Sequence, residues 1–147
     1  MNSECPVAYT PCDPQMVSET WGFVHPWIES ALEYSQDEMC AEDIYRRCEA
    51  GAYTMWLLAD KERSEPLGCF VTYFADWPRK RILNVLIAAG RSLDLWCSAL
   101  DMLDMFAAQN GAEEIRFFGR PGLERVMGRH GFYKSYTVMS RDVGRRH

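Results

Sequence analysis

The fold of this chain is decided by ILNVLIAAGRS (residues 82–92), an apolar run that breaks at Gly90. A helical pattern at 93–110 follows, and 113–118 then has the composition of a second strand. Strands separated by a helical pattern predict a βαβ unit with parallel neighbours. Ligands of such sheets bind where the parallel strands end at their carboxyl side. We therefore look for function around Gly90 and around residues 119–120.

The other elements flank this unit on both sides. After a turn, the pattern predicts a short helix at 123–130, and Gly131-Phe132 then leads into a final strand. Upstream, we expect an edge strand at 7–10, a helix that begins at Asp13-Pro14, a helix at 41–50, and a hairpin of 53–59 with 67–75. The predicted fold is α/β (α+β), a single domain over 1–147. Its order is strand, helix, helix, three strands, helix, strand, helix, strand, around a mixed sheet.

Composition narrows the class of protein. With 147 residues, 48% of them hydrophobic, one globular domain is expected. No apolar run approaches the roughly 20 residues that span a bilayer, and the first residues lack the features of a signal peptide. The six cysteines form no Cys-x-x-Cys pair and have no histidine at zinc-finger spacing. We expect reduced thiols in a cytoplasmic protein and no metal site, with a disulfide or metal framework as the alternative.

Charge is distributed unevenly along the chain. Of 16 Lys+Arg and 21 Asp+Glu, residues 116–147 carry 8 and 2, which leaves 8 and 19 for residues 1–115. The two parts therefore have net charges of +6 and −11. A basic C-terminal third attracts a phosphorylated ligand, a nucleic acid or an acidic partner, and the alternative is solvated surface. The overall net charge of −5 argues against nucleic-acid binding.

This order and these lengths of elements resemble the GNAT (Gcn5-related N-acetyltransferase) superfamily over essentially the whole chain. The last helix is also similar, with Leu123, Val126 and Met127 at its apolar positions and Gly131-Phe132 before the final strand. Residues 119–125 look more particularly like small GNAT-like proteins of tailed bacteriophages. The resemblance implies that strands 82–89 and 113–118 splay apart and that acetyl-CoA lies in the gap. A phage protein of this kind would work in the host cytoplasm or in the virion.

The resemblance also implies where the acetyl donor binds. In the family, a phosphate loop with Gln or Arg, two further residues, and then Gly-x-Gly or Gly-x-Ala precedes the helix. Arg91 aligns with the first of these positions, but Asp94 and Trp96 replace the small residues, so the loop is degenerate. With Ser92 as N-cap, Asp94 in the first helical turn would repel a pyrophosphate. The cofactor-binding residues that the resemblance implies are Ile87, Ala88, Ala89, Gly90, Arg91, Ser92 and Arg120.

Catalytic residues are not evident from the sequence. The family uses a general base, often Glu, and often a Tyr in the last helix. That helix contains Val126-Met127 and no Tyr, and Tyr133 and Tyr136 fall on the predicted final strand. The polar residues in or beside the central strands are Thr72, Asp76 and Asn84, and we assign a catalytic role to none of them. Trp96 either stacks on an adenine or, at helical spacing with Leu93 and Leu100, packs in the core.

Two classes of function remain open. One is an acetyl-CoA-dependent N-acyltransferase with an atypical cofactor loop, which would take a small-molecule acyl donor. The other is a non-catalytic GNAT-fold phage protein that acts as a virion component or a protein-interaction module. The helix at 93–110 is apolar around most of its circumference, which predicts cover on both sides by the sheet and by another element or subunit. That pattern and the surplus tryptophans Trp21, Trp27, Trp56 and Trp77 favour a protein partner or a homo-oligomer.

Overall fold

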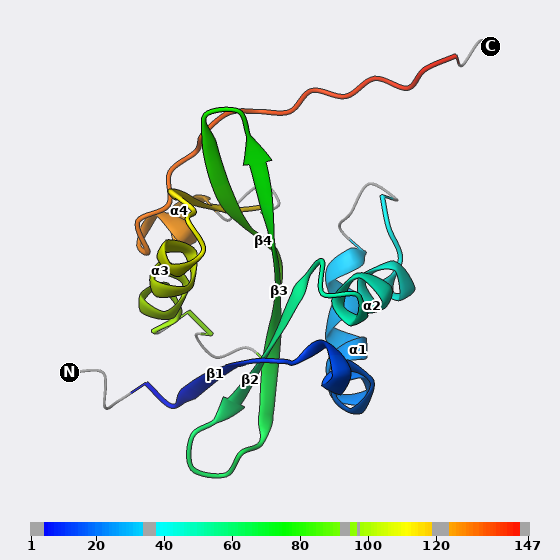
Figure 1. The fold of residues 1–147 in the computed structure, drawn as a ribbon, viewed down its shortest axis with the longest axis vertical. Helices are drawn as coiled ribbons and strands as arrows, with labels where there is room; N and C mark the ends of the chain where they lie inside the picture. Colours follow the sequence, from blue (N-terminus) through cyan, green and yellow to red (C-terminus); the bar gives the residue numbers. More distant parts are fainter. Residues whose placement is uncertain (1–4, 34–37, 92–94, 97, 119–123, 145–147) are drawn as a thin grey trace.

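A mixed sheet forms the centre of the protein, whose computed structural model describes residues 5–33, 38–91, 95–96, 98–118 and 124–144 (Figure 1). In these ranges the sheet has five strands in the order β1-β2-β3-β4-β5. The strands from β1 to β4 pair antiparallel, whereas β4 and β5 are parallel. The strand bounds are Val7–Pro11 (β1), Thr54–Asp60 (β2), Pro66–Trp77 (β3), Lys80–Gly90 (β4) and Glu114–Phe117 (β5). The predicted edge strand, the hairpin and the parallel pair are confirmed.

Helices cover both faces of this sheet (Figure 1). One face carries α1 (Val17–Leu32) and α2 (Ala41–Glu49), and the other carries α3 (Ala99–Gln109) and α4 (Glu124–Gly128). The predicted start at Asp13-Pro14 is a short 3-10 helix, η2 (Pro14–Met16), capped by the Asp13 carboxylate, which accepts from the Gln15 amide at 2.9 Å. Pro26 lies inside α1, which continues through it to Leu32.

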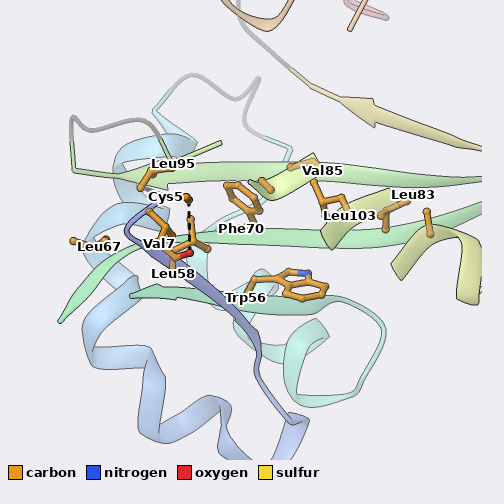
Figure 2. Packing of buried hydrophobic residues seen from close by; sticks show 12 residues of the cluster. Cys5, Val7, Trp56, Leu58, Leu67, Phe70, Leu83, Val85, Leu95 and Leu103 are labelled. Carbon is orange, nitrogen blue, oxygen red and sulfur yellow. Dashed lines mark hydrogen bonds between the residues drawn. The ribbon is translucent and has the colours of Figure 1, made fainter. Parts of the chain in front are cut away.

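Two apolar clusters fill the space between the sheet and these helix layers. Figure 2 shows the cluster on the α3 side, where Phe70 and Val85 of the sheet lie close to Leu103 of α3. The second cluster joins α1 and α2 to the opposite side chains of the same strands, for example Val71 and Ile87. Because strand side chains alternate between faces, one strand contributes to both clusters. The largest fully buried side chains include Ile28, Ile44, Met55, Leu58, Phe70, Ile82, Leu83 and Leu103.

Glycines follow the carboxyl ends of α2 and α4. Gly51 and Gly131 have φ of +82° and +86°, a conformation that glycine adopts without a Cβ penalty. After α4, the Phe132 amide donates to the Met127 carbonyl at 3.2 Å, and the Ala52 amide donates to the Arg47 carbonyl after α2 at 2.9 Å. These six-to-one hydrogen bonds are the Schellman arrangement, which satisfies the last carbonyls of a helix.

The predicted helix at 93–110 begins later than expected, at Ala99. Leu95 and Trp96 lie in turns before it, while Ser92 and Asp94, the predicted cap and first-turn acid, lie outside the described residues. The Tyr9 hydroxyl donates to the Leu95 carbonyl, and the Leu95 side chain is buried against the sheet. Apolar side chains at helical spacing are therefore buried here without a helix, because tertiary contacts take the place of helical ones.

One further expectation about the C-terminal third is wrong. No strand follows α4 within the described residues 129–144, and Tyr133, Val138 and Met139 are 76–87% exposed there. A strand forms only where a neighbour accepts its backbone hydrogen bonds, and these residues have no such neighbour in the described chain. Within this chain the helix α3 is covered on one side, since Asp101, Asp104 and Met105 are exposed, and the expected cover of its other side by another subunit stays a prediction.

Cysteine chemistry departs from the expectation at one position. Cys5 is buried and disulfide-bonded, which corrects the expectation of reduced thiols there. Cys12, Cys40, Cys48 and Cys69 are free, and burial raises the pKa of the Cys48 and Cys69 thiols to about 12. Separately, no helix within the described ranges combines the length and apolar character that crossing a bilayer requires.

Candidate functional site

The parallel strands β4 and β5 part at the middle of β4. Their pairing covers Ile82–Val85 of β4 and Glu114–Phe117 of β5, and the Phe118 amide adds a last hydrogen bond to the Val85 carbonyl at 3.3 Å. Beyond this point Ile87–Gly90 is paired with β3 and has no partner in the described part of β5. In the part of the chain that the structure describes, the backbone of this half-strand therefore borders a gap in the sheet.

A bulge in β4 lies at the same place. Val85 is opposite Thr72 and Ile87 is opposite Val71, so that Leu86 is an extra residue without a counterpart in β3. Leu86 and Ile87 accordingly both contact the cluster on the α1 side, whereas Val85 and Ala88 contact the α3 side. A bulge bends its strand and strengthens its twist. We attribute the separation of β4 from β5 to this extra residue.

The predicted cofactor-binding residues occupy the half-strand beyond the bulge. Ile87, Ala88 and Ala89 pair with Val71, Phe70 and Cys69 of β3, and Gly90 ends the strand. Arg91 follows directly, and its amide donates to the Leu67 carbonyl at 2.9 Å. The structure thus brings residues 87–91 together along the gap. Ser92 and Arg120, the other two predicted residues, lie outside the described part of the chain.

Gly90 is required by strand packing. A Cβ on Gly90 would lie 2.4 Å from the Leu67 carbonyl oxygen and 2.5 Å from the Gly68 Cα. A Cβ on Gly68, its partner in β3, would meet the Ala89 carbonyl oxygen at 2.5 Å. The two glycines allow β3 and β4 to approach closely where Leu95 packs over them. This contact accounts for Gly90 without a ligand.

Arg91 is bound by a carboxylate of the same chain. Its Nη2 lies 2.8 Å from Glu65 Oε1, and both side chains are about half exposed, at 52% and 42%. An exposed pair of this kind contributes only about 0–1 kcal/mol, so a stronger anion can replace the carboxylate. In the structure, however, the positive charge that the sequence assigned to a phosphate is already paired.

An aromatic cluster lies beside the gap on the α3 and α4 side. Trp96 contacts Phe70 of β3 and Phe117 of β5, with ring centroids 4.9 and 5.6 Å apart. It also contacts Phe132 at 5.7 Å and His130 at 6.2 Å, both of which follow α4. We call Phe70, Trp96, Phe117, His130 and Phe132 the Trp96 cluster. The packing role expected for Trp96 is what the structure shows, and the cluster joins β5 to β3 and to the residues after α4.

Polar groups are few on the opposite face of the gap. Asn84 is 4% exposed and stands next to Tyr73 in the register, and the Tyr73 ring stacks on Tyr53 at 4.8 Å. Burial is the main cause that raises the pKa of Tyr73. The hydroxyl of Thr72, on the other face, accepts from the Trp56 indole at 3.0 Å. Asp76 is paired with Arg81 at 3.5 Å, far along the hairpin. None of these groups is a buried carboxylate.

A charge network on β5 holds the paired half of the parallel strands. Glu114 accepts from Lys80 of β4 and from Arg116 of β5, each at 2.6 Å. These hydrogen bonds, Lys80 first, lower the pKa of the Glu114 carboxyl. Arg116 also donates to the Tyr136 hydroxyl at 3.2 Å. Sequence reasoning missed this network, although Glu114 and Arg116 are two residues apart on a strand and must share a face.

Replacing Glu114 by glutamine should make the stability of the folded protein depend less on pH in the acidic range. The folded-state pKa of Glu114 lies below its ordinary value, so its contribution is present above about pH 4.5 and is lost as pH falls through the lowered pKa. We expect Glu114→Gln to lower the melting temperature by about 1–3 °C at pH 7, since the pair is partly exposed and screened. The difference should vanish in acid. Glu113→Gln is the matched control, and an equal effect of both variants would contradict the assignment.

Comparison with known proteins shows which solved structures share this architecture. No protein-family model matches the chain, and no curated protein matches it by sequence. Solved structures do match. An aminoglycoside acetyltransferase from an uncultured soil metagenomic sample, in complex with sisomicin, has a TM-score of 0.68 at 7% identity over 95% of this chain and 97% of its own.

Two further structures give the same picture. A predicted acetyltransferase with acetyl-CoA from Clostridium acetobutylicum has a TM-score of 0.66 at 12% identity and covers 93% of this chain and 96% of its own. An acetyltransferase of Trypanosoma brucei has a TM-score of 0.62 at 9% identity and covers 93% and 99%. At these identities the likeness concerns the fold. The chain has the GNAT fold of these acetyltransferases, which confirms the fold expected from the order of elements.

Proposed function

We propose that this protein is an acetyl-CoA-dependent N-acyltransferase. One observation carries the proposal: β4 and β5 part after Val85, beside a bulge, in a fold shared with solved acetyltransferases. The parted strands present backbone amides and carbonyls along Leu86–Gly90, which are suited to bind an extended thioester arm. The chain shares its fold with solved acetyltransferases, and the donor and the reaction are what we propose.

The described residues fit part of such a donor. The half-strand at Ile87–Gly90 would hold the arm by backbone hydrogen bonds, since its outer edge has no partner in the described part of β5. Arg91 would bind a phosphate once Glu65 is released. Ser92 and Arg120 are proposed as further contacts. When bound, the donor supplies an acetyl group as a thioester, which an amine can attack.

This chain's own contribution is then mainly to position the reactants. Tyr73 and Asn84 are the polar side chains nearest to the bulge on the α1 side, and both can form hydrogen bonds to an acceptor. With its pKa raised, Tyr73 stays protonated at neutral pH and acts as a donor rather than a base. The acceptor amine must lose a proton and the thiolate must gain one. We assign neither step to a side chain.

Calorimetric titration with acetyl-CoA tests the proposal. We expect binding by the wild type, a loss of about fivefold or more in Arg91→Ala, and a gain of roughly two- to fivefold in Glu65→Gln, because that change frees the guanidinium. Arg63→Ala is the matched control, because it removes an exposed arginine from the turn between β2 and β3 that also carries Glu65. This variant should bind acetyl-CoA like the wild type. Absence of binding in the wild type would reject the proposal.

A second candidate function is favoured by the Trp96 cluster. Trp96 contacts β3, β5 and the residues after α4. An aromatic cluster that fills this place would preserve the fold and prevent an acetyl donor from binding. The protein would then be a non-catalytic interaction module, for example a phage virion component. This alternative predicts no heat on titration with acetyl-CoA or coenzyme A for the wild type and for Glu65→Gln.

A further inference from the structure

A row of polar side chains crosses the sheet on the face that carries α1 and α2. Asn84 is opposite Tyr73 of β3 on one side and Arg116 of β5 on the other. Neighbours of these residues along their strands contact the cluster on the α3 side: Phe74, Leu83, Val85, Ile115 and Phe117. Because side chains alternate between the faces of a strand, Tyr73, Asn84 and Arg116 share the other face. With Tyr53, whose ring stacks on Tyr73 at 4.8 Å, they form what we call the polar row.

Asn84 lies in the middle of the polar row and is only 4% exposed. None of the residues that the structure describes forms a hydrogen bond with its side-chain carboxamide. Thr72, by contrast, is equally buried on the other face and is paired with the Trp56 indole. A carboxamide offers two donor hydrogens and one acceptor oxygen, and leaving them unpaired in a buried place is costly. Asn84 is therefore suited to a ligand that both donates and accepts.

A positive charge borders Asn84 on the β5 side. Lys80 and Arg116 share one carboxylate, that of Glu114, with each contact at 2.6 Å, so the three groups have a net charge of +1. Arg116 donates to Glu114 and to the Tyr136 hydroxyl, and a guanidinium with five N–H groups has others to offer. Neighbouring strands lie about 4.8 Å apart. A ligand at Asn84 can therefore extend a carboxylate to Arg116.

Aromatic and acidic groups border Asn84 on the β3 side. The stacked rings of Tyr53 and Tyr73 are both half-buried. Burial raises the pKa of Tyr73, and Tyr53 and the nearby Glu38 carboxylate raise it further. Arg47 lies over Tyr53, the ring farther from Asn84, at 5.8 Å from the centroid. Apolar groups pack on such rings, and an ammonium is attracted by both a ring face and a carboxylate.

We propose that the polar row binds an α-amino acid with an apolar side chain as the acyl acceptor, with its amine at Asn84, its carboxylate at Arg116 and its side chain on Tyr73. This inference rests on the proposed function, because the row lies beside the bulge in β4. An amino acid carries its two charged groups on one carbon atom, which suits side chains of adjacent strands. A polyamine would meet the net positive charge beside β5 and is disfavoured.

The transfer step balances in atoms and protons. A C–N bond forms between the acetyl group and the amine, and the C–S bond of the thioester breaks. The ammonium loses two protons, of which one passes to the thiolate and one to solvent. The polar row supplies the position of the amine, and the proton transfers stay unassigned.

Calorimetric titration of the full chain with three probes, with and without coenzyme A, tests the acceptor. The probes are L-phenylalanine, phenethylamine, which lacks the carboxylate, and 3-phenylpropanoate, which lacks the amine. We expect L-phenylalanine to bind about tenfold more tightly than either analogue, because each analogue loses one charge-assisted contact. Arg116→Gln should reduce its affinity to that of phenethylamine. Arg125→Gln, which changes an exposed arginine of α4, is the matched control and should bind like the wild type.

Asn84→Leu separates binding from packing. Leucine keeps the branched shape and removes an unpaired buried carboxamide, so the melting temperature should not fall by more than about 2 °C. The affinity for L-phenylalanine should fall by about tenfold or more. Thr72→Val is the matched control on the other face. It leaves the Trp56 indole unpaired, so the melting temperature should fall by about 2–6 °C while L-phenylalanine binds as before.

Two results overturn the proposal. One is equal affinity for L-phenylalanine and phenethylamine, and the other is an Asn84→Leu variant that is destabilised and still binds L-phenylalanine like the wild type. The donor is tested separately. A chain that binds acetyl-CoA and none of the three probes rejects the amino-acid acceptor and leaves the proposed function standing. A chain that binds L-phenylalanine and no acetyl-CoA supports amino-acid binding by the polar row and rejects the proposed function.

Discussion

Replacing Phe70 by alanine should destabilise the protein by about 3–5 kcal/mol, the usual range for removing a fully buried phenylalanine. Phe70 is 0% exposed at the centre of the sheet, where it contacts Tyr9 at 5.9 Å and Trp96 at 4.9 Å between ring centroids. Its loss removes buried area and leaves a cavity under the Trp96 cluster. For a chain of this size the melting temperature should fall by roughly 8–16 °C.

Phe23→Ala is the matched control for this substitution. Phe23 is 57% exposed on α1, so the same change of side chain there removes little buried area and adds a good helix former. We expect its effect on the free energy of unfolding to stay within about 0.5 kcal/mol. Thermal unfolding followed by circular dichroism measures both variants. Similar losses in the two would show that Phe70 is not at the centre of the core.

Gly90→Ala should destabilise the protein by about 3 kcal/mol, which is at the upper end of the usual effects of overpacking. The loss is nearly as large as that expected for Phe70→Ala. The added methyl would lie 2.4 Å from the Leu67 carbonyl oxygen, which belongs to the backbone of β3 and cannot rotate away. Either β3 or β4 must shift, and the close contact between the strands is lost. The variant should unfold at a lower temperature and a lower urea concentration with an unchanged denaturant slope.

Gly22→Ala should change the free energy of unfolding in the opposite direction. Nothing lies within 4 Å of a Cβ placed on Gly22, which is inside α1, so alanine should stabilise the helix by roughly 0.5–1 kcal/mol. The pair separates a packing requirement from a general effect of replacing glycine. If Gly90→Ala were as stable as the wild type while Gly22→Ala was stabilised, Gly90 would instead be available for a ligand.

Local patterns account for what the sequence predicted well. The hairpin of β2 and β3 follows from two β-rich runs joined by a polar turn. The parallel pair follows from two strand runs around a helix. Each of these signals lies within a short window of residues. They are enough to predict the order of elements from β1 to α4 and, with it, the fold.

The site depended on contacts between distant residues, which a local pattern does not contain. Arg91 has the position of a phosphate ligand, but Glu65, its partner in the structure, is far away in the sequence. Leu95 and Trp96 have helical spacing, yet they pack from turns against Gly68 and Phe70. The segment after Gly131 has the composition of a strand but, among the described residues, no partner on which to form one. In each case tertiary contacts decided between two interpretations that the local sequence favoured equally.

Leu86, the extra residue in β4, determines how the gap between β4 and β5 can arise or disappear. Without Leu86, regular alternation would place Val85 and Ala88 towards α3 and Ile87 and Ala89 towards α1, where all four already lie. Deleting Leu86 would therefore straighten the strand without exchanging any side chain between the two cores. A one-codon insertion or deletion can thus open or close the parallel pair while the rest of the protein keeps its packing.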